Sequence, residues 1–418
     1  MKRNVLLLLL LLSILKVTPI GYNITRYGAV ADSTTMNTLA IQKAIDAAAA
    51  SGGGKIIIPK GIFLSGALFF KPNTHLYLEK GAVLKGSDNI ADYPYIPSRM
   101  EGQSLNYFAA LVNAYNVEGF TISGKGKIDG NGLKYWKQFW NRRDSMRRIG
   151  KEATNLEVSR PRLVFLWKCN KAVLRDVKFH NSGFWTIHIY QSNDVTIENA
   201  DIQSPLAPVP APSTDGIDLD VCKNVLIRRC YIAVNDDAIA IKGGKGPAAH
   251  LQPENGAVEN VLIEKCTFGP SHATLTMGSE CLNARNIILR NCKINNDGPV
   301  LNLKMRPDTY QVYENISIEN LRGKCGTLLR MKPWKQFYNP EGEEGKPYGV
   351  IQNIQFNGIK MDGKSFVDVE GNPNDSVQKI LFKNISYKAD NMKYNNKYCT
   401  STIYENVKLN NQVLVENK

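Results

Sequence analysis

Two short stretches of the chain concentrate carboxylates in a sequence otherwise rich in valine, isoleucine and asparagine. The first stretch, STDGIDLD, contains Asp215, Asp218 and Asp220. The second stretch, VNDDAIAIK, contains Asp236 and Asp237. Carboxylates at this density have three common uses: they form turns, they bind a cation such as Ca²⁺, or they act as the acid and base of an enzyme.

Three polar residues stand just ahead of an alternating apolar stretch, each at a similar offset. They are Asp215, Asp237 and His272, separated by 22 and 35 residues. If each interval is one coil of a repeating strand structure, these residues lie on rungs ~4.8 Å apart. We expect them to form a row on one outer face, which Lys304, 32 residues after His272, extends.

A row of this kind suits hydrolysis of a glycosidic bond. Enzymes that invert the anomeric centre hold two carboxyl groups ~6.5–9.5 Å apart, and crowding raises a carboxyl pKa so that one group stays protonated as the acid. A nearby lysine and histidine suit the carboxylate of a uronic acid. The predicted catalytic cluster consists of Asp215, Asp236, Asp237, His272 and Lys304. Asp218 and Asp220 follow Asp215 within the strand, and we interpret them as strand and turn residues.

The elements that must position these residues repeat along most of the chain. In seven segments a polar pair, often ending in asparagine, precedes an alternating β-branched stretch; they include KNVLIRRCYI, ENVLIEKCTF and RNIILRNCKI. The segments start at residues 193, 223, 259, 285, 314, 352 and 378, so their spacing varies from 26 to 38 residues. Alternation with period two indicates strands, and the preceding asparagine indicates a turn. A constant strand motif at variable spacing predicts an all-β fold, a parallel β-helix whose turns differ in length.

Cysteines fall at one position of this repeat. Cys230, Cys266 and Cys292 each follow the alternating stretch at the same offset, so we expect them to stack in a column inside the solenoid. Buried free thiols act as small apolar residues. We therefore predict no essential disulfide framework, although the chain has eight cysteines.

The open end of a β-helix must be covered. Residues 37–50, NTLAIQKAIDAAAA, have helical composition, with an apolar side of Leu39, Ile41, Ala44 and Ile45, and SGGG ends the helix. We interpret this helix as the N-terminal cap and residues 55–130 as the first coils.

Residues 131–160 interrupt the strand pattern with a basic and aromatic segment. Tyr135 and Phe139, and Trp136 and Trp140, are pairs at the spacing of one helical turn. One interpretation is an amphipathic helix that covers a flank of the solenoid. The other is a sugar-binding wall, because aromatic faces suit sugar rings and arginine suits carboxylates.

The first residues have the layout of a secretory signal. Lys2 and Arg3 precede a short apolar run, which is too short to span a bilayer, so we assign residues 1–20 to a signal peptide and 21–418 to the β-helix domain. Without that segment, the formal net charge of +14 falls to about +11. A basic exported protein attracts polyanions. Export to the periplasm or outside the cell favours an acidic polysaccharide over nucleic acid, with no stable membrane association after signal removal, and we expect a monomer.

Several motifs, in this order, resemble glycoside hydrolase family 28, the polygalacturonase and rhamnogalacturonan hydrolase family. They are YGAVADSTTMNTLAIQKAIDAA, GKGKIDGNG, STDGIDLD, VNDDAIAIK, SHATLTMGSE and LNLKMRP, and the resemblance runs from about residue 22 to 320. It implies a single-stranded, right-handed parallel β-helix of the pectin-lyase type, inverting hydrolysis without a metal, and acidic pectic substrates.

The resemblance also implies roles for single residues. Asp236 is similar to the family's proton donor, Asp215 and Asp237 to the pair that activates water, His272 to the active-site histidine and Lys304 to the ligand of the substrate carboxylate. Three residues depart from the family pattern: Ser213 replaces an asparagine, Ser271 and Ala273 replace two glycines around His272, and Asn302 replaces a substrate-binding arginine.

The missing arginine removes a bidentate carboxylate contact, for which Arg306 is a candidate substitute. We predict that Lys304, Asn302 and Arg306 bind the substrate. LKMRPDTYQVYENI is more similar to exo-acting and rhamnogalacturonan-acting bacterial members than to fungal endo-enzymes. We therefore expect an exported exo-polygalacturonase or rhamnogalacturonan-type galacturonohydrolase. A Ca²⁺-dependent β-eliminating pectate lyase and a non-catalytic polysaccharide-binding solenoid are the alternatives.

Overall fold

The computed structural model describes residues 21–336, 347–391, 395–397, 399 and 401–414. The predicted signal peptide, residues 1–20, lies outside the described residues. Within them, no helix is long and apolar enough to cross a membrane.

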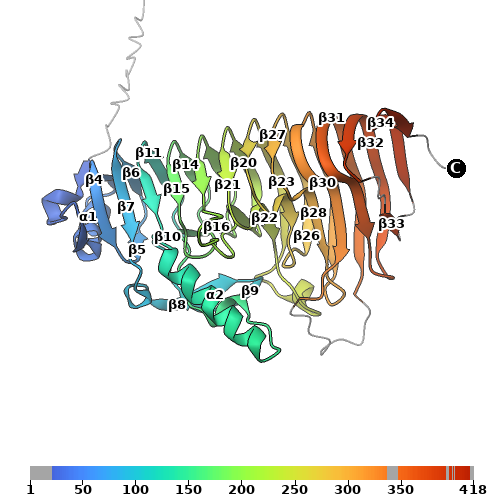
Figure 1. Cartoon of the computed structure of the whole chain (residues 1–418). Helices are drawn as coiled ribbons and strands as arrows, with labels where there is room; N and C mark the ends of the chain where they lie inside the picture. The colour runs from blue at the N-terminus through green and yellow to red at the C-terminus, as the bar shows by residue number, and fades with distance from the viewer. Residues whose placement is uncertain (1–20, 337–346, 392–394, 398, 400, 415–418) are drawn as a thin grey trace, which may run out of the picture.

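The chain winds into a long parallel β-helix, drawn from blue to red in Figure 1. Strands fall into three columns of parallel neighbours, and successive coils add one strand to each column, as β19–β22, β20–β23 and β21–β24 show. The column that carries the predicted catalytic residues is called the cleft sheet. Its strands are β5 (Leu68–Phe70), β10 (Val112–Tyr115), β13 (Val164–Trp167), β16 (Ile187–Tyr190), β19 (Ile217–Asp220), β22 (Asp237–Lys242), β25 (Ala273–Met277) and β28 (Pro299–Met305).

The second and third columns complete each coil. The second contains β1 (Gly21–Asn23), β3 (Gly54–Ile58), β6 (Thr74–Leu78), β11 (Thr121–Gly124), β14 (Val173–Arg175), β17 (Thr196–Glu198), β20 (Lys223–Arg228), β23 (Ala257–Glu264), β26 (Asn283–Arg290) and β29 (Gln311–Glu319). The third contains β2 (Asp32–Met36), β4 (Gly61–Ser65), β7 (Ala82–Gly86), β12 (Lys127–Asp129), β15 (Lys178–His180), β18 (Asp201–Gln203), β21 (Tyr231–Ala233), β24 (Thr267–Phe268) and β27 (Lys293–Asn295).

In the last coils the strands run on through the corners and serve more than one column. These strands are β30 (Arg322–Pro333), β31 (Gly349–Glu370), β32 (Ser376–Ala389), β33 (Asn395–Lys397) and β34 (Thr402–Leu409), and β35 (Gln412–Leu414) pairs antiparallel with β34. The all-β parallel solenoid that the repeat predicts is confirmed.

Asparagines form one corner of the coils. Asn224, Asn260, Asn286, Asn315 and Asn353 all have φ between 56° and 58°, a left-handed conformation that asparagine tolerates better than most residues. Their side-chain amides bond to one another along the solenoid axis at 3.0–3.2 Å. The polar pair before each alternating stretch is therefore a stacked turn, as the sequence predicts.

Inward-pointing apolar residues of all three columns fill the interior. Cys230, Cys266 and Cys292 are each 2% exposed and stack on successive coils, with the Cys266 backbone N–H 3.4 Å from the Cys292 sulfur. All eight cysteines are free thiols. The expected column of cysteines inside the solenoid is confirmed.

The helix α1 (Thr38–Ala50) covers the N-terminal end of the solenoid (Figure 1). Its buried side consists of Ile41, Ala44, Ile45 and Ala48. The inclusion of Leu39 in that side is wrong, because its side chain is 77% exposed at the first turn of the helix.

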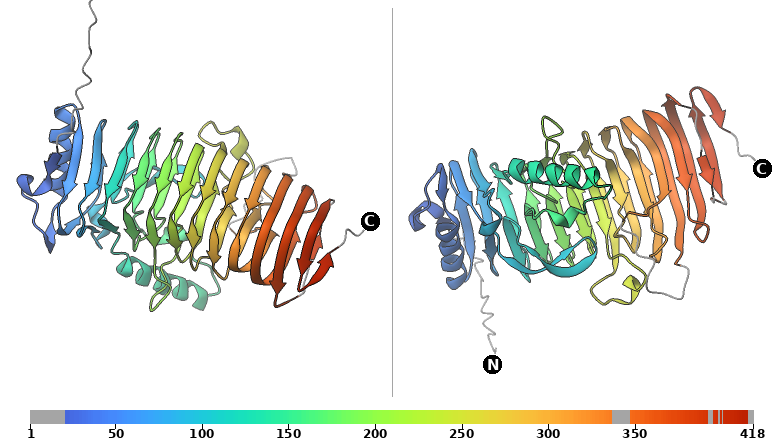
Figure 2. Two further views of the ribbon diagram at one scale, coloured as in Figure 1. Left: turned by 90° about the horizontal axis from the view of Figure 1, so that it is seen from above. Right: turned by 60° about the horizontal axis from the view of Figure 1, so that its bottom comes forward.

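Two excursions leave the strand pattern on the side of the cleft sheet. They are the hairpin of β8 (Tyr95–Met100) and β9 (Gln103–Phe108), and the helix α2 (Leu133–Arg148). Figures 1 and 2 show both lying along the same face of the solenoid, beside the middle coils. Three short 3₁₀ turns border them or the next coil: η2 (Ile90–Asp92), η3 (Asn155–Glu157) and η4 (Ala249–Leu251); a fourth, η1 (Ile24–Tyr27), lies at the N-terminus.

Candidate active site

The carboxylates of the predicted cluster come from two neighbouring coils of the cleft sheet. Asp215 precedes β19, and Asp236 and Asp237 lie at the start of β22. The N–H of Gly216 donates to the Asp237 carbonyl at 3.0 Å, so Asp215 and Asp237 lie side by side on adjacent rungs. The structure therefore brings the carboxylates of the two stretches together.

The expected row is wrong in its register beyond Asp237. Asp237 pairs with Ala273, so His272 is level with Asp236 and not with Asp237. The imidazole Nδ1 of His272 lies 3.3 Å from the Asp236 carboxylate.

Lys304 stands still further from the expected position. Leu303 is in register with Met277, and Met277 with Ile241, so Lys304 is level with Lys242 at the far end of its strand. Its long side chain nevertheless reaches back along the sheet, and its ammonium lies 2.9 Å from the Asp237 carboxylate. Lys304 therefore joins the cluster through the length of its side chain and not through its position in the strand register.

Burial and neighbouring charge give the acidic groups different protonation behaviour. Asp215 is only 5% exposed, and burial, followed by the negative charges of Asp218 and Asp236, raises its pKa well above the ordinary range. Burial also opposes ionisation of Asp236, but the hydrogen bond and positive charge of His272 outweigh it and lower the pKa of Asp236. The same hydrogen bond raises the pKa of His272. Asp215 is therefore harder to ionise than Asp236, which forms an ion pair with His272.

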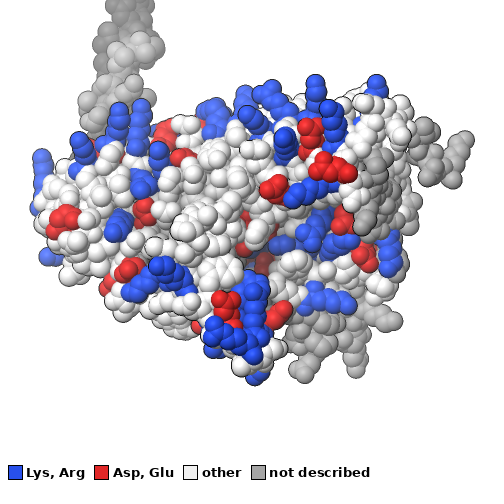
Figure 3. Space-filling model, viewed as in Figure 1, with Lys and Arg blue, Asp and Glu red and all other residues white. Residues whose placement is uncertain are grey.

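These groups line a cleft of about 540 Å³ over the cleft sheet. Figure 3 shows acidic side chains recessed in the middle of this face, with lysine and arginine beside them. The cleft is continuous with a second groove of about 390 Å³, which shares Asp237, His272, Lys304 and Trp334 with it.

The two further residues predicted to bind substrate lie in these hollows. Asn302 points into the second groove, in register with Arg330 on the next strand. Arg306 lines the main cleft but is only 3% exposed, and its guanidinium forms a bidentate pair with Asp308 at 2.6 and 2.7 Å. Arg306 is therefore held in the cleft wall by a residue of the same loop.

The helix α2 has one side buried against the solenoid and another side that faces the cleft. Tyr135, Trp136 and Phe139 are buried against the solenoid. Trp140 and Arg143 line the cleft, and the Trp140 indole N–H donates to the Pro210 carbonyl at 2.8 Å. The helix thus covers a flank and supplies one wall of the cleft.

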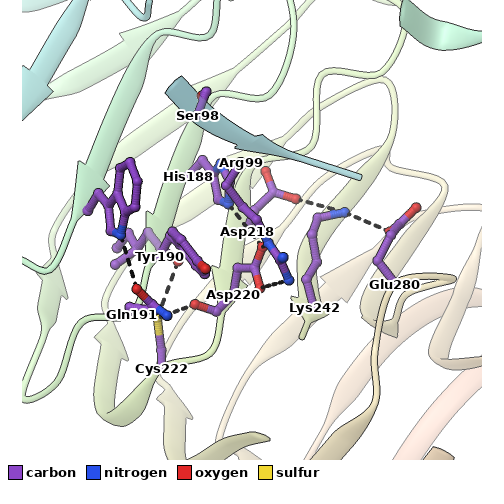
Figure 4. Close-up of polar contacts among 12 residues, drawn as sticks. Ser98, Arg99, His188, Tyr190, Gln191, Asp218, Asp220, Cys222, Lys242 and Glu280 are labelled. Atoms are coloured by element: carbon purple, nitrogen blue, oxygen red, sulfur yellow. Dashed lines mark hydrogen bonds and ion pairs between the residues drawn. The ribbon is translucent and has the colours of Figure 1, made fainter. Parts of the chain in front are cut away.

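The sequence interpretation of Asp218 and Asp220 is incomplete. Both are strand residues, but their side chains are fully buried and charged groups surround them. Asp220 pairs with Arg99 of the hairpin at 3.0 Å, and Asp218 lies 3.3 Å from the Lys242 ammonium. Figure 4 shows this buried network.

Lys242 and Glu280 were missed in the sequence, although both line the cleft. Alternation with period two was the signal for Lys242: it places Lys242 in register with Asp220, on the outer face of an otherwise apolar strand. Glu280 lies in a loop, where no periodicity marks it.

A solenoid with neighbouring carboxylates in a cleft on one sheet is compatible with a glycoside hydrolase of the parallel β-helix class. The chain belongs to glycoside hydrolase family 28, whose family model matches residues 54–412. The resemblance seen in the motifs is thereby confirmed.

Relatives with assigned activities are similar over most of the chain. A probable polygalacturonase of Vitis vinifera is 27% identical, over 86% of this chain and 72% of that protein. An exo-poly-alpha-D-galacturonosidase of Dickeya chrysanthemi is 30% identical over 64% of this chain, which spans half of that protein's length. The crystal structure of a hyperthermoactive exopolygalacturonase from Thermotoga maritima superposes with a TM-score of 0.79 at 25% identity, covering 94% of this chain and 93% of that one.

Proposed function

We propose that the chain is an exported, exo-acting enzyme that hydrolyses α-galacturonosidic bonds in pectic polysaccharide with inversion. Its family membership and its relatives support the polysaccharide class. The apolar run of residues 1–20 supports export. One observation carries the exo mode of action: a wall of protein closes one end of the cleft.

The wall is built from the tip of the β8–β9 hairpin and the loop after β22. Glu101 at the tip pairs with Lys245 of the loop at 3.2 Å and accepts a hydrogen bond from Asn155 at 3.1 Å. Gly102 packs so closely that an added Cβ would lie 2.9 Å from the Cβ of Glu280 and 3.1 Å from the backbone of Gly244. A polysaccharide cannot pass through this contact.

The wall separates the main cleft from a hollow behind it. Glu101 and Lys245 line the cleft, whereas Gly102, Gln103 and again Lys245 line a hollow of about 510 Å³ on the other side. At the opposite end, the cleft continues into the groove of Asn302 and Arg330. A chain end therefore fits between the wall and the carboxylates, and the rest of the polymer leaves through the groove.

The reaction uses the three aspartates in two roles. Asp236 donates a proton to the glycosidic oxygen, and Asp215 and Asp237 take the proton of the attacking water. His272 and Asp236 share one proton across their 3.3 Å contact. With a sugar bound, that proton moves to Asp236 and from there to the leaving group. Lys304 and Arg330 provide positive charge for the uronate carboxylates.

A product-size profile tests the proposal. On homogalacturonan the wild-type protein should release galacturonic acid from the start, while the viscosity of the solution falls slowly. The same profile on rhamnogalacturonan distinguishes the two pectic substrates. Early oligomers with a rapid loss of viscosity would contradict the exo mode, and no product from any pectin would contradict hydrolysis itself.

Two controls separate hydrolysis from the alternatives. Asp236→Asn should lower the rate of reducing-sugar release by about 10²–10⁴ and still bind oligosaccharide, whereas Asp390→Asn, an exposed residue after β32, should leave the rate unchanged. Loss of activity in chelator, with an unsaturated product, would identify a lyase.

A further inference from the structure

Lys242 is a buried lysine directly beneath the predicted catalytic cluster. It ends β22, is 3% exposed, and is in register with Asp220 of the neighbouring strand. Its ammonium lies 3.2 Å from Glu280, 3.3 Å from Asp218 and 3.5 Å from Asp215. Figure 4 shows the ammonium between Asp218 and Glu280. One buried cation thus serves three carboxylates.

The rest of its surroundings leave the lysine almost completely buried. The indole ring of Trp185 covers the ammonium at 4.1 Å from the ring centre. Glu280 also accepts a hydrogen bond from the Ser279 hydroxyl at 2.7 Å, and its Cβ packs against Gly102 of the wall. Electrostatic attraction is stronger at such a buried site than in water. The position of the ammonium is therefore fixed from three sides.

Asp215 needs this cation because its other close neighbours are acidic. Asp218, Asp236 and Asp237 all face it, and burial adds to their effect in raising the pKa of Asp215. Among the described residues, Lys242 is the only lysine, arginine or histidine within 4 Å of the Asp215 carboxylate. A base must be ionised to accept a proton.

Lys242 itself is held in the charged state by its partners. Glu280, Asp218, Asp215 and Asp237 face the ammonium and keep its pKa well above the usual range despite burial. The lysine in turn keeps the pKa of Glu280 low, whereas burial raises the pKa of Asp218 to about 7. Lys242 and Glu280 thus both favour their charged forms.

We propose that Lys242 is a positioning residue that favours the ionised form of Asp215 and orients it as a base, with Glu280 holding the ammonium in place. The proposal rests on the proposed hydrolytic function and on Asp215 as one of its bases. Lys242 acts through Asp215 and does not itself touch the reacting atoms.

The variant Lys242→Met tests the proposal in the full-length protein, because methionine keeps the length and removes the charge. An opposite charge within ~4–6 Å lowers a carboxyl pKa by about 1–3 units. Without it, the acidic limb of kcat/KM on a galacturonic acid oligomer should move to higher pH by about 1–3 units. At a pH below the new limb, kcat should fall at least tenfold with KM nearly unchanged. Lys242→Arg should keep the acidic limb near its wild-type pH.

A double variant separates electrostatics from folding. Lys242→Met leaves Glu280 buried without its partner, so the variant loses stability for that reason alone. Lys242→Met/Glu280→Gln should regain stability against urea but keep the displaced acidic limb. Recovery of the wild-type pH profile in the double variant would overturn the proposal and leave Lys242 a structural residue.

A matched lysine controls for loss of charge in general. Lys223 pairs with Glu259 at 2.8 Å on the exposed face of the neighbouring column, so Lys223→Met should leave the pH profile unchanged. An unshifted acidic limb in Lys242→Met also overturns the proposal. Absence of product from the wild-type protein is a different result, because it refutes the proposed function and not the role of Lys242.

Discussion

Replacing Arg99 with methionine should loosen the wall that closes the cleft. Arg99 lies in β8, two residues before Glu101, and its guanidinium contacts Asp220 of the cleft sheet at 3.0 and 3.3 Å. Both side chains are completely buried. The Arg162 guanidinium supports the same strand by donating to the Arg99 carbonyl at 3.0 Å.

The magnitude follows from the burial of the pair. Removing one partner of a buried ion pair costs ~3–5 kcal/mol, because the remaining charge has lost its compensation. In Arg99→Met that charge is Asp220, which retains only a 3.5 Å contact with the His188 ring in place of the guanidinium. An exposed pair such as Arg142–Glu157, at 2.7 Å, is worth less than about 1 kcal/mol, so Arg142→Met is the matched control.

Urea unfolding and hydrogen exchange measure the effect. Arg99→Met should lower the free energy of unfolding by about 3–5 kcal/mol and speed amide exchange in residues 95–108. Arg99→Met/Asp220→Leu should recover most of the loss, because apolar replacement of a buried pair is often neutral. The product profile of the single variant should gain oligomers, since a mobile hairpin no longer stops the chain.

Two results would refute the reasoning. If Arg99→Met costs no more than Arg142→Met, the buried pair does not anchor the hairpin. If amide exchange speeds up in residues 95–108 but the products remain monomeric, the hairpin is anchored as described but does not decide the mode of action.

Three further predictions concern single side chains. His272→Gln should move the basic limb of kcat/KM to lower pH. The contact with Asp236 raises the pKa of His272, and the pair loses its shared proton when the pH exceeds that pKa. An unchanged basic limb would show that His272 does not supply the proton. Trp140→Ala should raise KM about tenfold with little change in kcat, if its ring contacts a sugar, and an unaltered KM would remove it from the sugar wall. Burial lowers the pKa of His188 to about 3, below the ordinary value near 6.5, so the unfolded chain binds the proton first and stability falls as the pH drops from about 6.5 toward 3. His188→Gln should lose roughly 3 kcal/mol less than the wild type between pH 7 and pH 4 by urea unfolding, and an equal loss would place the acid sensitivity elsewhere.

The solenoid could be predicted because its evidence is local and repeated. Each coil has the same turn sequence and the same alternation of apolar and polar residues. The stacking of Asn224 on Asn260 and of Cys230 on Cys266 therefore follows from the repeat. The carboxylates of neighbouring coils meet for the same reason. The repeat assigns each residue to a coil, and residues on neighbouring coils are one rung apart.

The exact register could not be predicted, because the turns between strands vary in length. A one-residue difference places His272 beside Asp236, and a lysine at the far end of its strand still reaches Asp237 because its side chain is long. The wall that closes the cleft also could not be predicted from the sequence. Arg99 and Asp220 are 121 residues apart, and no local pattern pairs a hairpin with a strand at that distance.

In the proposed mechanism, three identical side chains take different roles because their cationic neighbours differ. Asp236 has His272, which is largely exposed and able to exchange a proton, and Asp237 has the Lys304 ammonium at 2.9 Å. Asp215 shares the Lys242 ammonium with Glu280, which lies closer to it, at 3.2 Å against 3.5 Å. A titratable partner suits a proton donor, whereas permanent positive charge suits groups that must stay ionised. The cations around the carboxylates therefore set the proposed partition of acid and base, and exchanging a cation should exchange a role before it destroys the fold.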